Sequence, residues 1–236
     1  MGTAIALSHN MFDAALCLGI CDKIVPGPVI GALRFGHLPV VFVPGGPMAT
    51  GLPTSEKSGS APAALPKGKA TREELLDAEM PTTMSPGTCT FYGTANTNQM
   101  LMEVMGLHLP GAAFVNPNTP LRDALTRFAV RAGASPDAAV NGHTRRMAEI
   151  VDEKAIVERG GRAAGHGRFH QPHPAPAGDR AAAGIQLTWE DMAELPKSYR
   201  SSARIYPNGK ADINHFHAAG GMSYRDPRAA RRRPAA

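Results

Sequence analysis

The hydrophobic pattern near the start of the chain predicts a helix, a second helix and a buried strand. Between Ser8 and Leu18, apolar residues at helical spacing predict a short helix, with Ser8 or Asn10 as its N-cap. Pro26 and Pro28 interrupt the chain, and the segment PVIGALRF that follows predicts a second helix. The apolar run LPVVFV, ended by PGGP, predicts a buried strand.

The same alternation continues downstream. A helix is expected to begin at Asn96 or Thr97 and to end at Gly106. The run GAAFV predicts another short strand, and Thr119 with Pro120 predicts the start of a further helix. Short strands alternating with helices indicate an α/β domain with a mainly parallel sheet flanked by helices. In such a domain, turns that carry ligands lie at strand ends.

Two sequence blocks place a thiol beside other groups that bind metals. GICDKIVPG contains Cys21, Asp22 and Lys23, and PGTCTFYGTAN contains Cys89 in a glycine-rich turn before the expected helix. Two distant thiolates, one of them next to a carboxylate and an amine, fit a site assembled by folding better than a local zinc knuckle. The blocks therefore indicate iron–sulfur and metal chemistry. The alternative for each thiol is a buried free cysteine.

Composition narrows the class of protein. The 3 cysteines are too few, and odd in number, for a disulfide scaffold, which favours reduced thiols or metal ligation. We find no apolar run of about 18 residues and no basic lead-in at the start, so we expect no membrane span or secretory signal and a cytoplasmic location. The net charge is +5, but 5 Arg and 1 Asp in residues 224–236 supply most of it. A nucleic-acid partner is therefore not expected.

Several blocks, in order, carry a family resemblance. CDKIVPG, FGHLPVVFVPGGPM, the block around Cys89, GLHLPGAAFVNP and NHFHAAGGM resemble the dihydroxy-acid and 6-phosphogluconate dehydratase family. The sequence around Phe91 and Tyr92 resembles the phosphogluconate branch of the family more than the dihydroxy-acid branch. The resemblance extends over residues 1–222 and implies part of the N-terminal α/β domain of that family. Residues 223–236 form an aberrant Arg-rich tail.

The resemblance implies a hydro-lyase that removes water from a sugar-acid phosphate, 6-phospho-D-gluconate, in the Entner–Doudoroff pathway. In similar proteins, cysteines matching Cys21 and Cys89 hold an iron–sulfur cluster of the 4Fe–4S or 2Fe–2S type. Residues matching Asp22 and Lys23, the lysine as its carbamate in some members, bind Mg²⁺. Cys17 stands where relatives have an apolar residue, so we expect it to pack in the core. The intact family member is expected to be a homodimer.

The resemblance also implies that parts of the site are missing. An upstream Cys-Asp-Gly segment would precede Met1, and a downstream half with the catalytic base would follow Ala236. We therefore expect an internal fragment that is inactive alone and has no identified catalytic residue. The alternatives are another sugar-acid dehydratase of the same family, a non-catalytic remnant, or a basic nucleic-acid-binding protein.

Segments between the family blocks lack the spacing of apolar residues that is typical of helices and strands, and they are rich in Ala, Pro, Arg, Ser and His. Read from the second base of each codon, DPRAARRRPAA can encode IRELLDAGLL, an amphipathic helix. The same shift of reading frame turns two other segments into sequence that is similar to the family's. We interpret them as local frameshifts and predict disorder near residues 58–66, 158–182 and 224–236. An unbroken frame in the resequenced gene would refute the interpretation.

Two features remain open on sequence alone. His215 and His217 alternate as on a strand or turn, and they either contact substrate or pair with backbone. The turn of residues 93–96 either favours an anionic cluster or phosphate, or is a plain N-cap.

Overall fold

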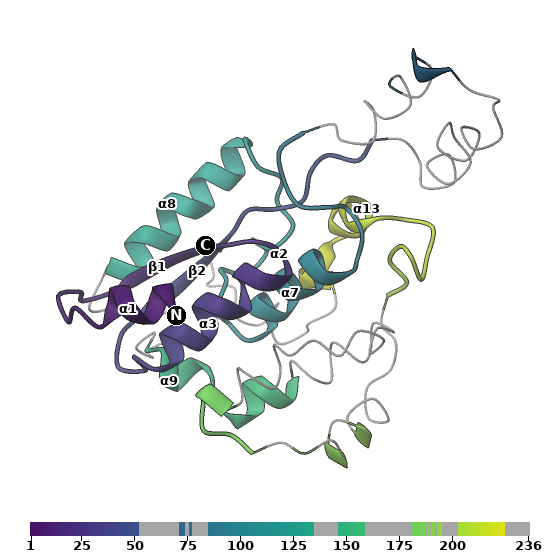
Figure 1. Ribbon diagram of the computed structural model, residues 1–236. Coiled ribbons are helices and arrows are strands. Elements are labelled where there is room, and N and C mark those ends of the chain that lie inside the picture. The colour runs from purple at the N-terminus through teal and green to yellow at the C-terminus, as the bar shows by residue number, and fades with distance from the viewer. Residues whose placement is uncertain are drawn as a thin grey trace.

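The computed structural model describes residues 1–51, 71–73, 76, 85–134, 146–158, 181–186, 188, 190–191, 193–194 and 203–224 (Figure 1). In chain order its named elements are α1 (Gly2–Leu7), β1 (Ala15–Gly19), α2 (Cys21–Ile24), α3 (Pro26–Leu33), β2 (Val40–Pro44), α7 (Thr94–Val104), α8 (Pro120–Ala134), α9 (Met147–Ile150), α13 (Ile213–Ala218) and the 3-10 helix η3 (Gly221–Tyr224).

The centre of the fold is a parallel pair of strands covered on both faces. β1 and β2 pair in register from Ala15 opposite Val40 to Gly19 opposite Pro44. In Figure 1, α8 lies on one side of this pair, and α1, α2 and α3 lie on the other. Every residue of β2 is buried, as expected for a parallel strand between two helical layers. This arrangement confirms the predicted α/β class with a parallel sheet.

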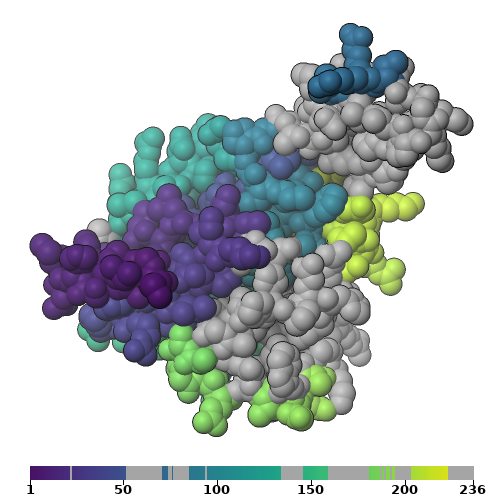
Figure 2. All heavy atoms as spheres, in the orientation of Figure 1, coloured from purple at the N-terminus to yellow at the C-terminus, as the bar shows by residue number. Residues whose placement is uncertain are grey.

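The two faces of β2 pack against different clusters. Val40 and Phe42 belong to the larger apolar core, which includes Val29 of α3. Val41 and Val43 pack in a separate cluster with residues of α8 and the loop before it. Figure 2 shows the first residues of the chain, in dark purple, at one end of the molecule, away from the yellow C-terminal helix α13.

The helix predicted between Ser8 and Leu18 is wrong. The chain forms α1 earlier, and the hydroxyl of Ser8 donates to the carbonyl of Ile5 at the end of that helix (2.6 Å). Residues 15–19 form β1 instead, with side chains that alternate between half-buried and exposed. The apolar residues suit either period, and the hydrogen bonds from β2 decide between them.

Cys17 lies on the half-buried side of β1 and packs against the larger core cluster. Burial raises the pKa of its thiol to about 11. Because a thiolate is the form that binds metals, this environment suits a packing role better than a ligand role. The position agrees with the core role expected from the sequence.

The remaining predicted helices are confirmed with small shifts of their ends. α3 covers most of the predicted segment, and α8 begins at Pro120 as expected. α7 begins at Thr94, two residues before Asn96, and its C-cap is Met105, which precedes Gly106 with φ +80°. The positive φ explains why glycine follows this helix.

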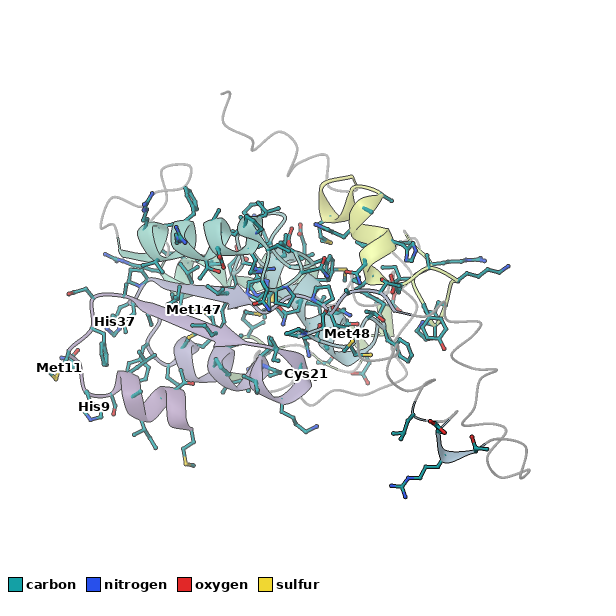
Figure 3. The ribbon with its side chains drawn as sticks, turned by 90° about the horizontal axis from the view of Figure 1, so that it is seen from above. His9, Met11, Cys21, His37, Met48 and Met147 are labelled. Atoms are coloured by element: carbon teal, nitrogen blue, oxygen red, sulfur yellow. The ribbon has the colours of Figure 1, made fainter. Side chains whose placement is uncertain are left out.

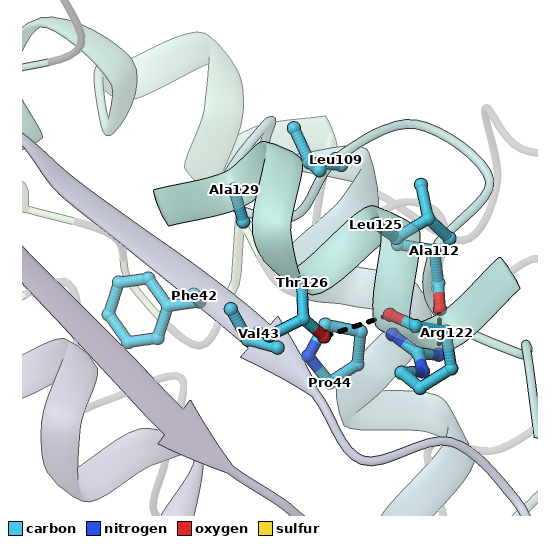
Figure 4. Close-up of a pocket in the computed structure, with 9 residues that line it drawn as sticks. All are labelled: Phe42, Val43, Pro44, Leu109, Ala112, Arg122, Leu125, Thr126 and Ala129. Carbon is cyan, nitrogen blue, oxygen red and sulfur yellow. Dashed lines mark hydrogen bonds between the residues drawn. The ribbon is translucent and has the colours of Figure 1, made fainter. Parts of the chain in front are cut away.

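The second predicted strand, GAAFV, is wrong: these residues form a buried loop. The carboxylate of Glu103 accepts hydrogen bonds from the backbone N–H groups of Gly111 (2.7 Å) and Ala113 (3.0 Å). On the other side, the guanidinium of Arg122 donates to the carbonyl of Ala112 (2.5 Å; Figure 4). Side chains from α7 and α8 thus satisfy backbone groups that a neighbouring strand would otherwise bind.

Two expectations fall largely outside the described residues. The segments 58–66, 158–182 and 224–236 lie almost wholly beyond them, as does most of the Arg-rich tail. In the described part of the chain, no helix is both long enough and apolar enough to cross a bilayer.

Candidate functional site

Cys21 lies two residues after Gly19, the carboxyl end of β1, at the first position of α2. Its φ is +68°, a left-handed conformation that is uncommon for residues other than glycine. Such a conformation costs about 1–3 kcal/mol and persists only where surrounding contacts hold it. The residue is partly exposed at this end of the sheet.

Asp22 and Lys23 follow within α2. The side chain of Lys23 is exposed, whereas the side chain of Asp22 lies outside the described structure. The structure thus places the backbone of both residues beside Cys21 but does not locate the carboxylate.

Cys89 lies at the same end of the sheet as Cys21. The preceding residue, Thr88, forms a parallel bridge just beyond β2: its N–H donates to the carbonyl of Gly46 (3.0 Å), and its carbonyl accepts from Met48 (2.9 Å). Figure 3 shows His37, which precedes β2, toward one end of the molecule, and Cys21 and Met48 nearer its middle. Parallel pairing therefore brings both thiol-bearing turns to the carboxyl end of the strands.

The close approach at this bridge depends on a glycine. Gly87 has φ +134°, and a Cβ atom at that position would collide with the backbone of Pro47 and Met48. The glycine before the cysteine block is thus explained by its packing against the segment after β2.

Asn96, in the first turns of α7, holds the turn that carries Cys89. Its side-chain amide donates to the carbonyls of Cys89 (2.5 Å) and Phe91 (2.8 Å), and its Oδ1 accepts from the hydroxyl of Thr88 (3.3 Å). The side chain is fully buried. Asn96 thus serves the cysteine turn, a role that sequence reasoning missed when it treated this residue as a helix start.

His215 lies on a helix, so the strand or turn expected for His215 and His217 is wrong. Asp212 caps α13 by accepting from the backbone N–H of His215 (3.3 Å), and it also accepts from the Nδ1 of the same residue (2.8 Å). Figure 1 shows α13 beside the start of α7. The N–H of Ile213 donates to the carbonyl of Thr90, the residue after Cys89 (3.2 Å).

Asp212 also connects α13 to the segment after β2. The hydroxyl of Thr50 donates to its carboxylate (2.7 Å). Although burial alone would raise the pKa of Asp212, hydrogen bonds from Thr50 and His215 outweigh it and hold that pKa below its ordinary value. An ionised Asp212 orients the exposed ring of His215 at the edge of the site.

Two asparagines complete this network. Asn116 donates to the carbonyl of Pro47 (2.9 Å) and to the Oδ1 of Asn214 (2.9 Å), and Asn214 donates to the carbonyl of Met48 (2.8 Å). Sequence reasoning missed these roles. The only signal for them was their presence within family-like blocks, because their partners are far apart in the chain.

The described side chains supply part of a metal site. Among them, no group of three or more His, Cys, Asp or Glu lies close enough to hold a metal ion. Cys89 is exposed and Cys21 is partly exposed, and both lie at the same end of the sheet. Two thiols fit part of the ligand set of an iron–sulfur cluster, which needs further ligands from elsewhere.

The stability of the fold depends on pH through His108. Burial and the nearby charge of Arg122 lower the pKa of its imidazole to about 3, although a hydrogen bond with the backbone of Gln99 opposes the shift. The unfolded chain binds this proton near pH 6.5. Because the folded pKa is the lower one, stability is fully present above about pH 6.5 and is lost as the pH falls toward 3.

We expect urea unfolding to show a loss of about 2–3 kcal/mol between pH 7 and pH 4.5 from this residue alone. A His108→Gln variant should lose less over the same range, because its side chain takes up no proton. His9→Gln is the matched control, since His9 is exposed and its replacement leaves the buried imidazole of His108 in place. Equal slopes for all three proteins would contradict the assignment.

Comparisons with known proteins identify the family of this α/β domain with thiol-bearing turns. The family described as "Dihydroxy-acid/6-phosphogluconate dehydratase N-terminal" matches residues 1–225. The chain therefore belongs to the dihydroxy-acid/6-phosphogluconate dehydratase family, and the resemblance in the sequence blocks is confirmed.

The relatives also separate the two branches of the family. Phosphogluconate dehydratase of Pseudomonas aeruginosa is 65% identical over 226 residues, which cover 95% of this chain and 36% of that protein. The protein of the same name from Escherichia coli strain K12 is 50% identical over 225 residues, covering 94% of this chain and 36% of that protein. A dihydroxy-acid dehydratase of Anaeromyxobacter is 31% identical over 225 residues, 92% of this chain and 39% of that protein. The chain thus spans little more than a third of the length of these relatives.

Proposed function

We propose that this chain is part of a phosphogluconate dehydratase, which converts 6-phospho-D-gluconate to 2-dehydro-3-deoxy-6-phospho-D-gluconate and water in the Entner–Doudoroff pathway. One observation carries the assignment: identity to relatives with that name is 65% and 50%, against 31% to a dihydroxy-acid dehydratase. A dihydroxy-acid or other sugar-acid dehydratase is the less supported alternative.

In this proposal, Cys21 and Cys89 are two ligands of an iron–sulfur cluster of the 4Fe–4S or 2Fe–2S type. Asp22 and Lys23 bind Mg²⁺ next to it. The position of both thiols at the carboxyl end of the parallel strands supports the assignment, because α/β domains bind ligands there. When bound, the cluster would supply a Lewis acid for departure of the C3 hydroxyl.

In this proposal, the residues of this chain hold and orient the cofactor and the substrate. They do not abstract the proton. Dehydration removes a proton from C2 and hydroxide from C3, and in this proposal the base that takes the proton is not among residues 1–222. Asp212 and His215 border the Cys89 turn, where they present one oriented imidazole. We therefore propose that residues 1–222 are a partial N-terminal domain that is inactive alone.

The wider setting follows from the same proposal. The substrate is a small sugar-acid phosphate, and the intact protein works in the cytoplasm as a homodimer, without a nucleic-acid or membrane partner. Residues 223–236 lie outside the catalytic domain.

The test compares this chain with a version extended to the length of its relatives. Both are reconstituted anaerobically with iron and sulfide and then assayed for water loss from 6-phosphogluconate and from a 2,3-dihydroxy acid without phosphate. We expect the extended protein to prefer the phosphorylated substrate and the shorter chain to show no turnover. A preference for the unphosphorylated acid would support the alternative, and turnover by the short chain would refute the fragment assignment.

A further inference from the structure

We propose that Asn96 and Gln99 of α7 are positioning residues that together set the spacing between the turns that carry Cys21 and Cys89. The inference rests on the proposed function, in which these two thiols share a cluster. Asn96 and Gln99 are three residues apart, so they lie on the same side of the helix.

The contact on the Cys89 side is made by Asn96. One amide nitrogen donates to both the Cys89 carbonyl and the Phe91 carbonyl, so the turn is held on either side of Thr90. Because the side chain is fully buried, water does not compete for these hydrogen bonds.

The contact on the Cys21 side is made by Gln99. Its Nε2 donates to the carbonyl of Gly19, two residues before Cys21 (3.3 Å), and its side chain is also fully buried. α2 has only four residues and packs against α7. A helix this short has little stability of its own, so its position depends on tertiary contacts such as this one.

The other end of the Gln99 amide indicates why glutamine occupies this position. Its Oε1 atom finds no hydrogen-bond partner among the described residues. A buried acceptor without a partner costs about 1–3 kcal/mol, a cost that an apolar side chain of similar length would avoid. Among the described contacts, the hydrogen bond that Gln99 donates to the Gly19 carbonyl offsets this cost. We therefore infer that Gln99 holds the Cys21 turn in place.

The experiment measures the separation of the two turns directly in the chain without cluster. In a Cys17→Ser background, nitroxide labels on Cys21 and Cys89 report their separation by dipolar broadening of the continuous-wave electron paramagnetic resonance spectrum, which responds to spins as close together as two ligands of one cluster. We expect strong dipolar broadening for the parent and loss of that broadening for Gln99→Met, which keeps the length of the side chain but removes the donor. Asn98→Leu is the matched control, because Asn98 is a buried amide on the same helix without a described bond to either turn.

A second readout uses the extended protein. We expect Gln99→Met to lower its affinity for the cluster at least about tenfold, as removal of partners around metal ligands commonly does. Asn98→Leu should keep the parent's iron and sulfide content. Urea unfolding should give similar midpoints for both variants, which separates positioning from general stability.

Each result of these measurements either supports or overturns the inference. Undiminished dipolar broadening in Gln99→Met, no dipolar broadening in the parent, or an equal loss of broadening in Asn98→Leu would overturn the inference. If the extended parent takes up no cluster, the proposed function fails, while the distance measurement still tests the positioning of the turns.

Discussion

Replacing both Cys21 and Cys89 with serine should abolish cluster binding and dehydration in the extended, anaerobically reconstituted protein. A serine hydroxyl stays protonated near neutral pH and is a poor iron ligand, whereas a thiolate is the ligand that holds these clusters. We expect iron and sulfide to fall to background, with loss of visible cluster absorbance and of water loss from 6-phosphogluconate.

Cys17→Ser is the matched control for this experiment. The Cys17 sulfur packs against the core from β1, and its pKa of about 11 disfavours the thiolate. This variant should therefore keep its cluster, at some cost in stability. If the double variant still held iron and dehydrated normally, the proposed cluster site would be refuted.

Replacing Glu103 with alanine should destabilise the fold by about 2–5 kcal/mol, because each buried backbone donor left without an acceptor costs about 1–3 kcal/mol. Its carboxylate accepts from the N–H groups of Gly111 and Ala113, which would be left without an acceptor in a buried loop. Burial raises the pKa of Glu103, and these two donors and the charge of Arg122 oppose that shift. Arg122 would in turn lose the carboxylate that balances its charge.

Urea unfolding at pH 7 measures this loss. Glu103→Gln keeps one acceptor oxygen and should be less damaging than alanine. Glu153→Ala, which removes an exposed carboxylate, should change the unfolding free energy by less than about 0.5 kcal/mol. A loss below about 1 kcal/mol for Glu103→Ala would show that the loop does not depend on this carboxylate.

Elements with strong local signals were predictable from the sequence. Three such signals are the apolar run of β2, the proline at the start of α8 and the glycine after α7. Each of them affects the conformation of residues next to it in the chain. Local steric and capping rules therefore located these elements to within a few residues.

The errors arose where distant groups decide the conformation. Residues 15–19 are apolar at spacings that suit a helix or a strand, and pairing with β2, about 25 residues away, selects the strand. GAAFV has a strand-like composition, but Glu103 and Arg122 satisfy its backbone and hold it as a loop. Neither partner can be read from the segment itself.

The sequence by itself determined the family, the two cysteine blocks and the alternation of helices and strands, because each depends on residue identity or on short spacing. The assignment of Cys21, Cys89, Asp22 and Lys23 as ligands stays a prediction. Only the tertiary structure brought both cysteine turns to one end of the sheet and joined Thr50 to Asp212, 162 residues apart. Such contacts depend on how parallel strands and helices pack, and no local pattern encodes that geometry.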